Sequence, residues 1–133
     1  MSKTILFVCK HNRFRSKIAE AFFNKNNKNK NYIAESAGLL PEHYHLDKLQ
    51  VNIAREFGLH LKGKPRPITT DLLKKANIFV IAANDIPHSF FQNEKQGRKE
   101  YIWNIHDAKT AKEIRTTIKN IKKHVENLLK ELK

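Results

Sequence analysis

The feature that most constrains this sequence is a short apolar run that leads directly into the chain's one cysteine. Residues 5–8 read Ile-Leu-Phe-Val, and Cys9 comes next. Arg15 stands six positions after the cysteine, and a helical pattern of apolar residues follows from residue 18. A buried strand that ends in a tight turn and opens a helix points the backbone N–H groups of the turn at one spot, where the positive end of the helix dipole adds to their field. The sequence therefore predicts an oxyanion-binding loop over residues 9–16.

The residue types in this loop indicate phosphoryl transfer. A cysteine at the mouth of such a loop lies in a positive field that favours the thiolate, which is the nucleophilic form. The guanidinium of Arg15 can hold two phosphate oxygens in bidentate fashion. We therefore expect Cys9 to attack phosphorus and form a cysteinyl-phosphate, with Arg15 as the phosphate and transition-state clamp. Because the loop amides and Arg15 supply the positive field, we expect neither a metal nor any other cofactor.

The other loop residues are expected to support the same anion. Asn12 tolerates the positive φ that would turn the loop amides inward, and the Ser16 hydroxyl can donate a hydrogen bond to the Cys9 thiolate. The remaining positions are expected to supply mainly backbone N–H groups, with their side chains at the rim. The predicted phosphate-binding set is Lys10, His11, Asn12, Arg13, Phe14, Arg15 and Ser16.

The loop also carries a resemblance to a known family. Cys9-x5-Arg15-Ser16, with Asn12 third after the cysteine, resembles the signature loop of the low-molecular-weight protein tyrosine phosphatases. A second motif, Ser-Ala-Gly at residues 36–38, matches the same family at the expected distance, and its small residues are expected to let the chain pass close behind the loop. The resemblance covers essentially the whole chain. It implies a phosphatase that acts on phosphotyrosine proteins or other aryl phosphate monoesters, with inorganic phosphate or similar oxyanions as product or inhibitor.

The resemblance further implies a general acid and an aromatic wall. The family uses an aspartate after the fourth strand as acid and then base, and Asp107 occupies that place. Ala108 replaces the proline that follows in the family, which leaves the loop that carries Asp107 less rigid. Asp85, after the third strand, is the alternative acid, and a helix N-cap is the alternative role for Asp107. Tyr44 is a possible substrate wall, and ordinary surface packing is its alternative role.

Short, nearly continuous apolar runs predict four buried strands. These runs cover residues 3–8, 32–36, 78–83 and 101–105. Between them, helical spacing predicts one helix over residues 15–24 and another around Leu46, Leu49, Ile53 and Phe57, with Gly58 as the C′ residue that ends it. Further helices are predicted from an N-cap at Thr70 through Ala76 and in a turn led by Pro87. The pattern over residues 110–132 is amphipathic, so this last helix is expected to pack across the sheet.

This alternation predicts an α/β fold. We expect a single domain over residues 1–133, with a four-stranded parallel sheet, helices on both faces and the phosphate-binding loop after the first strand. The carboxyl ends of parallel strands share one edge of the sheet, where ligands bind. Cys9 and Asp107 are therefore expected to meet at that edge.

The composition limits the partners and the compartment. One cysteine allows no disulfide within the chain, which fits a reducing cytoplasm. Because the sequence has neither the apolar stretch of a signal peptide nor a run of about 18 apolar residues, no membrane association is expected. The 26 Lys and Arg residues exceed the 13 Asp and Glu residues, and the resulting net charge of +13 attracts anions. Nucleic acid is not the expected partner, since zinc-ligand pairs, an RRM-like aromatic motif and a Gly-rich KH loop are all missing from the sequence.

Two other functions are alternatives to phosphatase activity. His11-Asn12 inside the loop and Trp103, four residues before Asp107, resemble the arsenate-reductase branch of the family. Thioredoxin-coupled reductases need two further cysteines, so this sequence is compatible only with a reductase that borrows a small-molecule thiol or a glutaredoxin-like partner. The other alternative is a catalytically weak module that binds oxyanions or phosphorylated partners without turnover.

Overall fold

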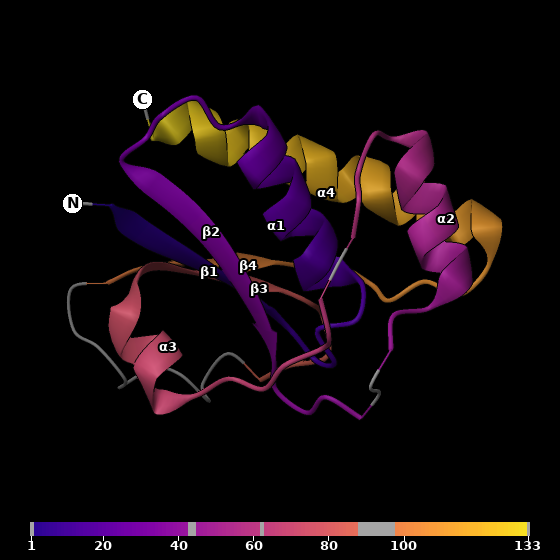
Figure 1. Ribbon diagram of the computed structural model, residues 1–133, viewed down its shortest axis with the longest axis horizontal. Helices are drawn as coiled ribbons and strands as arrows, with labels where there is room; N and C mark the ends of the chain where they lie inside the picture. The colour runs from indigo at the N-terminus through magenta and orange to yellow at the C-terminus, as the bar shows by residue number, and fades with distance from the viewer. Residues whose placement is uncertain (1, 43–44, 62, 88–97, 133) are drawn as a thin grey trace.

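Four parallel strands form one sheet in the computed structural model, which describes residues 2–42, 45–61, 63–87 and 98–132 (Figure 1). The strands are β1 (Lys3–Cys9), β2 (Tyr32–Gly38), β3 (Ala76–Ala82) and β4 (Lys99–Trp103). Their order across the sheet is β2-β1-β3-β4, and each neighbouring pair is parallel. After β2 the chain therefore crosses to the other side of β1. This reversal places the topological switch point beyond the carboxyl ends of β1 and β3, where open α/β sheets bind ligands.

Helices cover both faces of the sheet, which confirms the predicted fold class. α1 (Arg15–Asn26), α2 (Lys48–Glu56) and α4 (Ala111–Glu131) lie on one face, and the short α3 (Thr70–Lys75) lies on the other (Figure 1). Alternate residues of β1 enter two separate cores: Ile5 and Phe7 join the core under α1 and α4, whereas Leu6 and Val8 join the core under α3. A strand buried on both faces must be apolar without alternation, and this requirement explains the run at the start of the chain.

The long C-terminal helix α4 packs across the sheet beside α1, as its amphipathic pattern predicted. Its buried apolar residues recur three and four apart: Ile114, Ile118, Ile121, Val125 and Leu128. A capping box closes its N-terminus, because the Thr110 hydroxyl accepts from the backbone N–H of Glu113 while the Glu113 carboxylate accepts from the backbone N–H of Thr110. Neither α4 nor any other helix in the described residues is long and apolar enough to span a membrane.

Some predicted boundaries differ from the structure. The N-cap of α3 is Thr69, whose Oγ1 accepts from the backbone N–H of Leu72 at 3.1 Å, so the prediction of Thr70 is wrong by one residue. β4 ends at Trp103 and not at residue 105, because the backbone N–H of Ile105 turns back to the Trp103 carbonyl at 2.9 Å. The turn predicted to follow Pro87 lies outside the described residues.

The buried face of α2 also differs from the prediction. Asp47 caps the helix, accepting from the backbone N–H of Gln50 at 3.0 Å, and this start sets the phase of the helix. Gln50 and Ile53, three residues apart, then face the core with 8% and 2% of their surface exposed. Leu49, which was expected on that face, is 43% exposed. The helix ends as predicted, with a positive φ of 75° at Gly58.

The end of β2 passes directly behind the loop that follows β1. A Cβ atom at Gly38 would lie 2.7 Å from the backbone N of Asn12 and 2.7 Å from the backbone C of His11. The Gly38 backbone is also held from the other side, because its N–H donates to the Arg66 carbonyl at 2.9 Å and its carbonyl accepts from the Ile68 N–H at 3.0 Å. The Ser-Ala-Gly motif thus allows the close approach that its small residues predicted.

Replacing Gly38 by alanine should lower the free energy of unfolding by about 1–3 kcal/mol, because the new methyl group overpacks backbone atoms that cannot move independently. It should also weaken phosphate binding, because the clash displaces the loop at Asn12. Denaturant unfolding and a phosphate titration measure the two effects.

The matched control is Gly58→Ala, where φ is 75° and the new Cβ atom meets the flexible end of Lys25. This change should cost about 1 kcal/mol through backbone strain and leave phosphate affinity as it is. A Gly38→Ala protein with unchanged phosphate affinity would contradict the proposed link between β2 and the loop.

Candidate active site

The loop between β1 and α1 is held in place by the side chain of Asn12. The φ of Asn12 is 53°, the positive value that the sequence predicted. Its Oδ1 accepts from the backbone N–H of Arg66 at 3.0 Å, and its Nδ2 donates to the Oγ atoms of Ser16 at 2.8 Å and Ser36 at 3.0 Å. Because a backbone N–H can only donate, the contact with Arg66 determines which amide atom is the oxygen. Asn12 is fully buried, so these bonds replace water completely.

Cys9 lies at the end of β1 with two polar contacts to its sulfur. The Sγ of Cys9 lies 3.0 Å from the Oγ of Ser16, and the backbone N–H of Ser16 points at the same sulfur with an N···S distance of 3.4 Å. Since the Ser16 hydroxyl already accepts from Asn12, its own hydrogen is available to donate to the sulfur. Two donors directed at one sulfur stabilise a thiolate more than a thiol. The predicted contact between Ser16 and Cys9 is therefore present.

A second layer of polar side chains lies behind the loop. The hydroxyl of Ser36 accepts from Asn12 and donates to the Oε1 of Glu20 at 2.7 Å, while the Arg66 Nε donates to the Ser36 carbonyl at 2.8 Å. Lys17 lies in α1, as Glu20 does. Burial lowers the pKa of the Lys17 ammonium, and the Glu20 carboxylate opposes this shift. These bonds join the loop, β2, α1 and the segment around Arg66 into one support.

Arg15 is buried, with 2% of its surface exposed, and its guanidinium points toward the carboxyl ends of β3 and β4. Its Nη1 donates to the Ile105 carbonyl at 3.0 Å and lies 3.1 Å from the Oδ1 of Asp85, and its Nη2 donates to the Oδ2 of Asp85 at 3.2 Å. A buried cation next to a carboxylate is stable because the charges offset each other and the polar atoms are bonded. Asp85, predicted as the alternative acid, therefore orients Arg15 in this structure.

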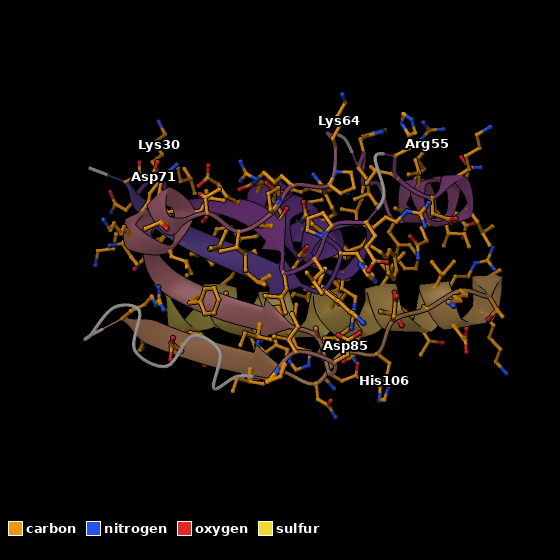
Figure 2. The ribbon with its side chains drawn as sticks, turned by 90° about the horizontal axis from the view of Figure 1, so that it is seen from below. Lys30, Arg55, Lys64, Asp71, Asp85 and His106 are labelled. Atoms are coloured by element: carbon orange, nitrogen blue, oxygen red, sulfur yellow. The ribbon has the colours of Figure 1, made fainter. Side chains whose placement is uncertain are left out.

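Two further side chains join the ends of β3 and β4. The Nη1 of Arg15 lies 3.4 Å from the Oδ1 of Asn84, and the Nδ2 of Asn84 lies 2.7 Å from the Nδ1 of His106. Figure 2 shows Asp85 and His106 beyond the carboxyl ends of the two strands. These contacts lie at the switch point of the sheet. Arg15 belongs to α1, and its guanidinium is held from the opposite side by residues that follow β3 and β4.

The predicted catalytic residues line one cavity of about 430 Å³. Cys9, Arg15 and Asp107 all contribute to its wall, so the three segments that carry them meet as the sequence predicted. The remaining lining residues are His11, Arg13, Phe14, Asp47, Gln50 and Lys109. Asn12 and Ser16, by contrast, are fully buried behind the loop, where their side chains support it.

The rim side chains of the loop are tied to the segment that follows β2. The Nδ1 of His11 lies 2.8 Å from the Leu40 carbonyl oxygen, and the Nε of Arg13 donates to the His45 carbonyl at 3.0 Å. These side chains therefore stand at the rim, as predicted, and Arg13 adds positive charge at the cavity mouth. Tyr44, the predicted substrate wall, lies outside the described residues.

The acid loop, residues 104–110, connects β4 to α4 and carries Asp107. The Asp107 side chain is exposed to the cavity, and its Oδ1 accepts from the backbone N–H of Ala108 at 3.0 Å. The N-cap of α4 is Thr110, so the alternative role of Asp107 as an N-cap is wrong. Trp103, just before this loop, packs in the core against Phe7 and stacks on His124, with centroid distances of 5.6 Å and 4.9 Å.

Gln50 is the site residue that sequence reasoning missed. It is buried in the first turn of α2, lines the cavity, and donates from Nε2 to the Ala108 carbonyl at 2.9 Å. A signal was present in the sequence, because Gln50 stands four residues after Leu46 and three before Ile53. This helical spacing predicts that position 50 faces the core. A polar residue there must find a buried partner.

Comparisons with known proteins agree with this geometry. The family model for low molecular weight phosphotyrosine protein phosphatases matches residues 4–133. A solved arsenate reductase from Archaeoglobus fulgidus is 27% identical, with 94% of this chain and 98% of that chain covered and a TM-score of 0.75. No curated protein sequence matches the chain.

Two phosphatase structures resemble the chain more closely in shape and less closely in sequence. A low molecular weight protein tyrosine phosphatase from T. tengcongensis is 21% identical, with 98% of this chain and 99% of that chain covered and a TM-score of 0.83. An arginine phosphatase from Geobacillus stearothermophilus is 17% identical, with 98% of this chain and 92% of that chain covered and a TM-score of 0.83. At these identities the two likenesses show a shared fold.

Replacing Asp85 by asparagine should destabilise the protein by about 1–3 kcal/mol, because the buried Arg15 loses the charge that offsets its own. A bound oxyanion restores that balance, so saturating phosphate should raise the melting temperature of Asp85→Asn more than that of the wild type. Thermal unfolding with and without phosphate gives both quantities.

Glu56→Gln is the control for this measurement, because it breaks an ion pair on the surface. The side chains of Glu56 and Arg115, which form this pair, are 49% and 46% exposed. Because solvent screens an exposed ion pair, the change should have little effect on the melting temperature and should leave the phosphate response unchanged. Equal phosphate-induced shifts for Asp85→Asn and wild type would show that Asp85 does not offset the charge of Arg15.

Proposed function

Because the chain belongs to the low molecular weight phosphotyrosine protein phosphatase family, we propose that it hydrolyses phosphotyrosine-type aryl phosphate monoesters through a cysteinyl-phosphate intermediate. The observation that carries the proposal is that Cys9, Arg15 and Asp107 line one cavity. A nucleophile, an anion clamp and a carboxyl group are the three components that such a reaction needs from the protein.

Binding of the substrate uses the loop and Arg15. The phosphate dianion sits over the loop, where the backbone N–H groups and the N-terminus of α1 provide a positive field. The Arg15 guanidinium binds two of its oxygens, and Asp85 keeps that guanidinium in orientation. Because these groups are organised before substrate arrives, they stabilise the charge of the transition state without further rearrangement. This positive field is sufficient for a mechanism without a metal.

The first chemical step transfers the phosphoryl group to the enzyme. The Cys9 thiolate attacks phosphorus in line with the leaving oxygen, forming an S–P bond while the P–O bond to the aryl group breaks. The carboxyl group of Asp107 donates its proton to that oxygen, so the aryl alcohol leaves neutral. Cys9 and Asp107 line the same cavity, and the Asp107 side chain is exposed, which leaves its carboxyl group accessible to the leaving oxygen.

The second step releases phosphate. The Asp107 carboxylate now accepts a proton from water as the water oxygen attacks phosphorus and the S–P bond breaks. Cys9 leaves as a thiolate, which is favoured by the Ser16 hydroxyl at 3.0 Å and the Ser16 N–H, whose nitrogen lies 3.4 Å from the sulfur. The same two donors therefore assist the nucleophile in the first step and the leaving group in the second.

Arsenate reduction is a second candidate function, supported by the 27% identity to the arsenate reductase from Archaeoglobus fulgidus. Here Cys9 would attack arsenic and form a thiol–arsenate adduct, with one arsenate oxygen leaving as water. An external thiol, such as glutathione or a glutaredoxin, would then attack the Cys9 sulfur. The S–As bond would break as the mixed disulfide forms, and its electron pair would reduce As(V) to As(III), which leaves as arsenite. The second thiol must come from another molecule, because the chain has one cysteine.

Phosphate release from p-nitrophenyl phosphate between pH 5 and 8, without added metal, tests the main proposal. Cys9→Ser should lose at least about a thousandfold in kcat, because the nucleophile is removed. Asp107→Asn should lose about a hundredfold or more, because the leaving oxygen receives no proton.

Glu56→Gln, which lies outside the cavity, should retain the wild-type rate and serves as the control. A wild type that binds phosphate and releases none would reject the phosphatase proposal. Arsenite formation that depends on added glutathione would then favour the reductase, and its absence would favour an oxyanion-binding module.

A further inference from the structure

Gln50 forms a contact that the mechanism does not use and that core packing does not require. Its side chain is buried, and its Nε2 donates to the Ala108 carbonyl at 2.9 Å. Among the described residues, its Oε1 is buried without a hydrogen-bond partner. A buried carbonyl oxygen without a partner is unfavourable, so a residue chosen for stability alone would not be a glutamine. The contact with Ala108 is therefore the feature that needs a function.

Gln50 extends from a rigid part of the structure, the first turn of α2. There its backbone N–H donates to the Asp47 carboxylate at 3.0 Å. α2 is anchored through Ile53 and Ala54, which are buried in the core under α1 and α4. A side chain that extends from this turn can hold a flexible loop at a defined distance from the sheet.

The acid loop is held at both ends by other groups. Near β4, Arg15 donates to the Ile105 carbonyl at 3.0 Å. Near α4, the Glu113 carboxylate accepts from the backbone N–H groups of Lys109 at 3.2 Å and Thr110 at 3.1 Å. Asp107 and Ala108 lie between these points, so the conformation of this short stretch depends on what binds its own polar groups.

Ala108 links Gln50 to the Asp107 carboxylate. The Ala108 carbonyl accepts from Gln50, and the Ala108 N–H donates to the Oδ1 of Asp107 at 3.0 Å. Alanine leaves φ adjustable, whereas a proline would restrict it, so an external contact is needed to hold this residue in one conformation. With Ala108 almost fully buried, a change at its carbonyl is transmitted to the N–H that contacts the carboxylate.

We propose that Gln50 is a positioning residue for Asp107, holding the acid loop through the Ala108 carbonyl so that the carboxyl group faces the leaving oxygen. The role given to Asp107 rests on the proposed phosphatase function. The contact between α2 and the acid loop does not depend on that function, so the two can be tested separately.

Gln50→Leu tests the contact directly. The variant removes the donor to Ala108 and also removes the unpartnered Oε1. Because these effects on folding oppose each other, the melting temperature should change little. Amide hydrogen exchange at Ala108 and Lys109 should become about three- to tenfold faster, which corresponds to the loss of one hydrogen bond. Glu56→Gln, which breaks a different contact of α2, should leave exchange at these two amides unchanged.

Kinetics then test whether the contact serves Asp107. Proton donation matters most for a poor leaving group. Gln50→Leu should therefore lower kcat/KM, which reports phosphoryl transfer to Cys9, about tenfold with phenyl phosphate and about two- to threefold with p-nitrophenyl phosphate. KM should stay near the wild-type value, since the loop after β1 is unchanged. In an Asp107→Asn background, Gln50→Leu should cause no further loss, because residues that act through one group are not additive.

The outcomes separate the two proposals. Unchanged exchange at Ala108 and Lys109 overturns the positioning role, whatever the activity. Faster exchange combined with an equal loss of kcat/KM for both substrates also overturns it, as does a full additional loss in the Asp107→Asn background. In either case Gln50 would act on something other than the acid. A wild type without phosphatase activity rejects the proposed function, and the exchange measurement alone then decides whether Gln50 holds the loop.

Discussion

The left-handed backbone at Asn12 is the constraint on which the candidate site depends. A residue at φ 53° turns the loop after β1 around the end of the strand, and few residues other than glycine accept that value without strain. Glycine would allow the turn but would leave it mobile. Asparagine also binds three separate groups with its side chain, at Ser16, Ser36 and the backbone of Arg66. The turn is thereby tied to α1, β2 and the segment before α3, and Cys9 and Arg15 keep a constant spacing.

Charge balance at the candidate site follows from the contacts of Arg15. A buried guanidinium without a counter-charge would be costly, and Asp85 and the Ile105 carbonyl offset it from the ends of β3 and β4. These partners follow β3 and β4, which lie on the far side of β1 from β2, so the sheet order itself brings them to Arg15. An oxyanion that enters the cavity would meet a cation that is already oriented, and this pre-organisation is the physical basis for the proposed binding of phosphate.

The acid loop follows a different principle from the loop after β1. Many hydrogen bonds fix the conformation of the loop after β1. The stretch around Asp107, by contrast, is short and partly exposed, and only a few contacts from other elements hold it. Local stability varies across a structure in this way, and loops that must change their protonation or position are often the less constrained ones. A hydrogen bond from α2 to Ala108 gives such a loop one preferred position while leaving its carboxyl group open to the cavity.

Local sequence determined the strand–loop–helix unit, the positive φ of Asn12, the contact of Ser16 with Cys9, and the amphipathic helix α4, because each depends on residues within a few turns of one another. It also determined the family, since the loop motif and the Ser-Ala-Gly turn lie in short continuous stretches. Tertiary structure decided the partner of Arg15, the cap of α3, the inner face of α2 and the role of Gln50. The contacts of Arg15 and Gln50 join segments 58 to 90 residues apart along the chain, and their pairing depends on sheet order and on the phase of each helix, which no local pattern encodes. Helix α2 shows this difference: the sequence predicted that Gly58 ends the helix, whereas the partner of Gln50, the Ala108 carbonyl, is set by how α2 packs beside the acid loop.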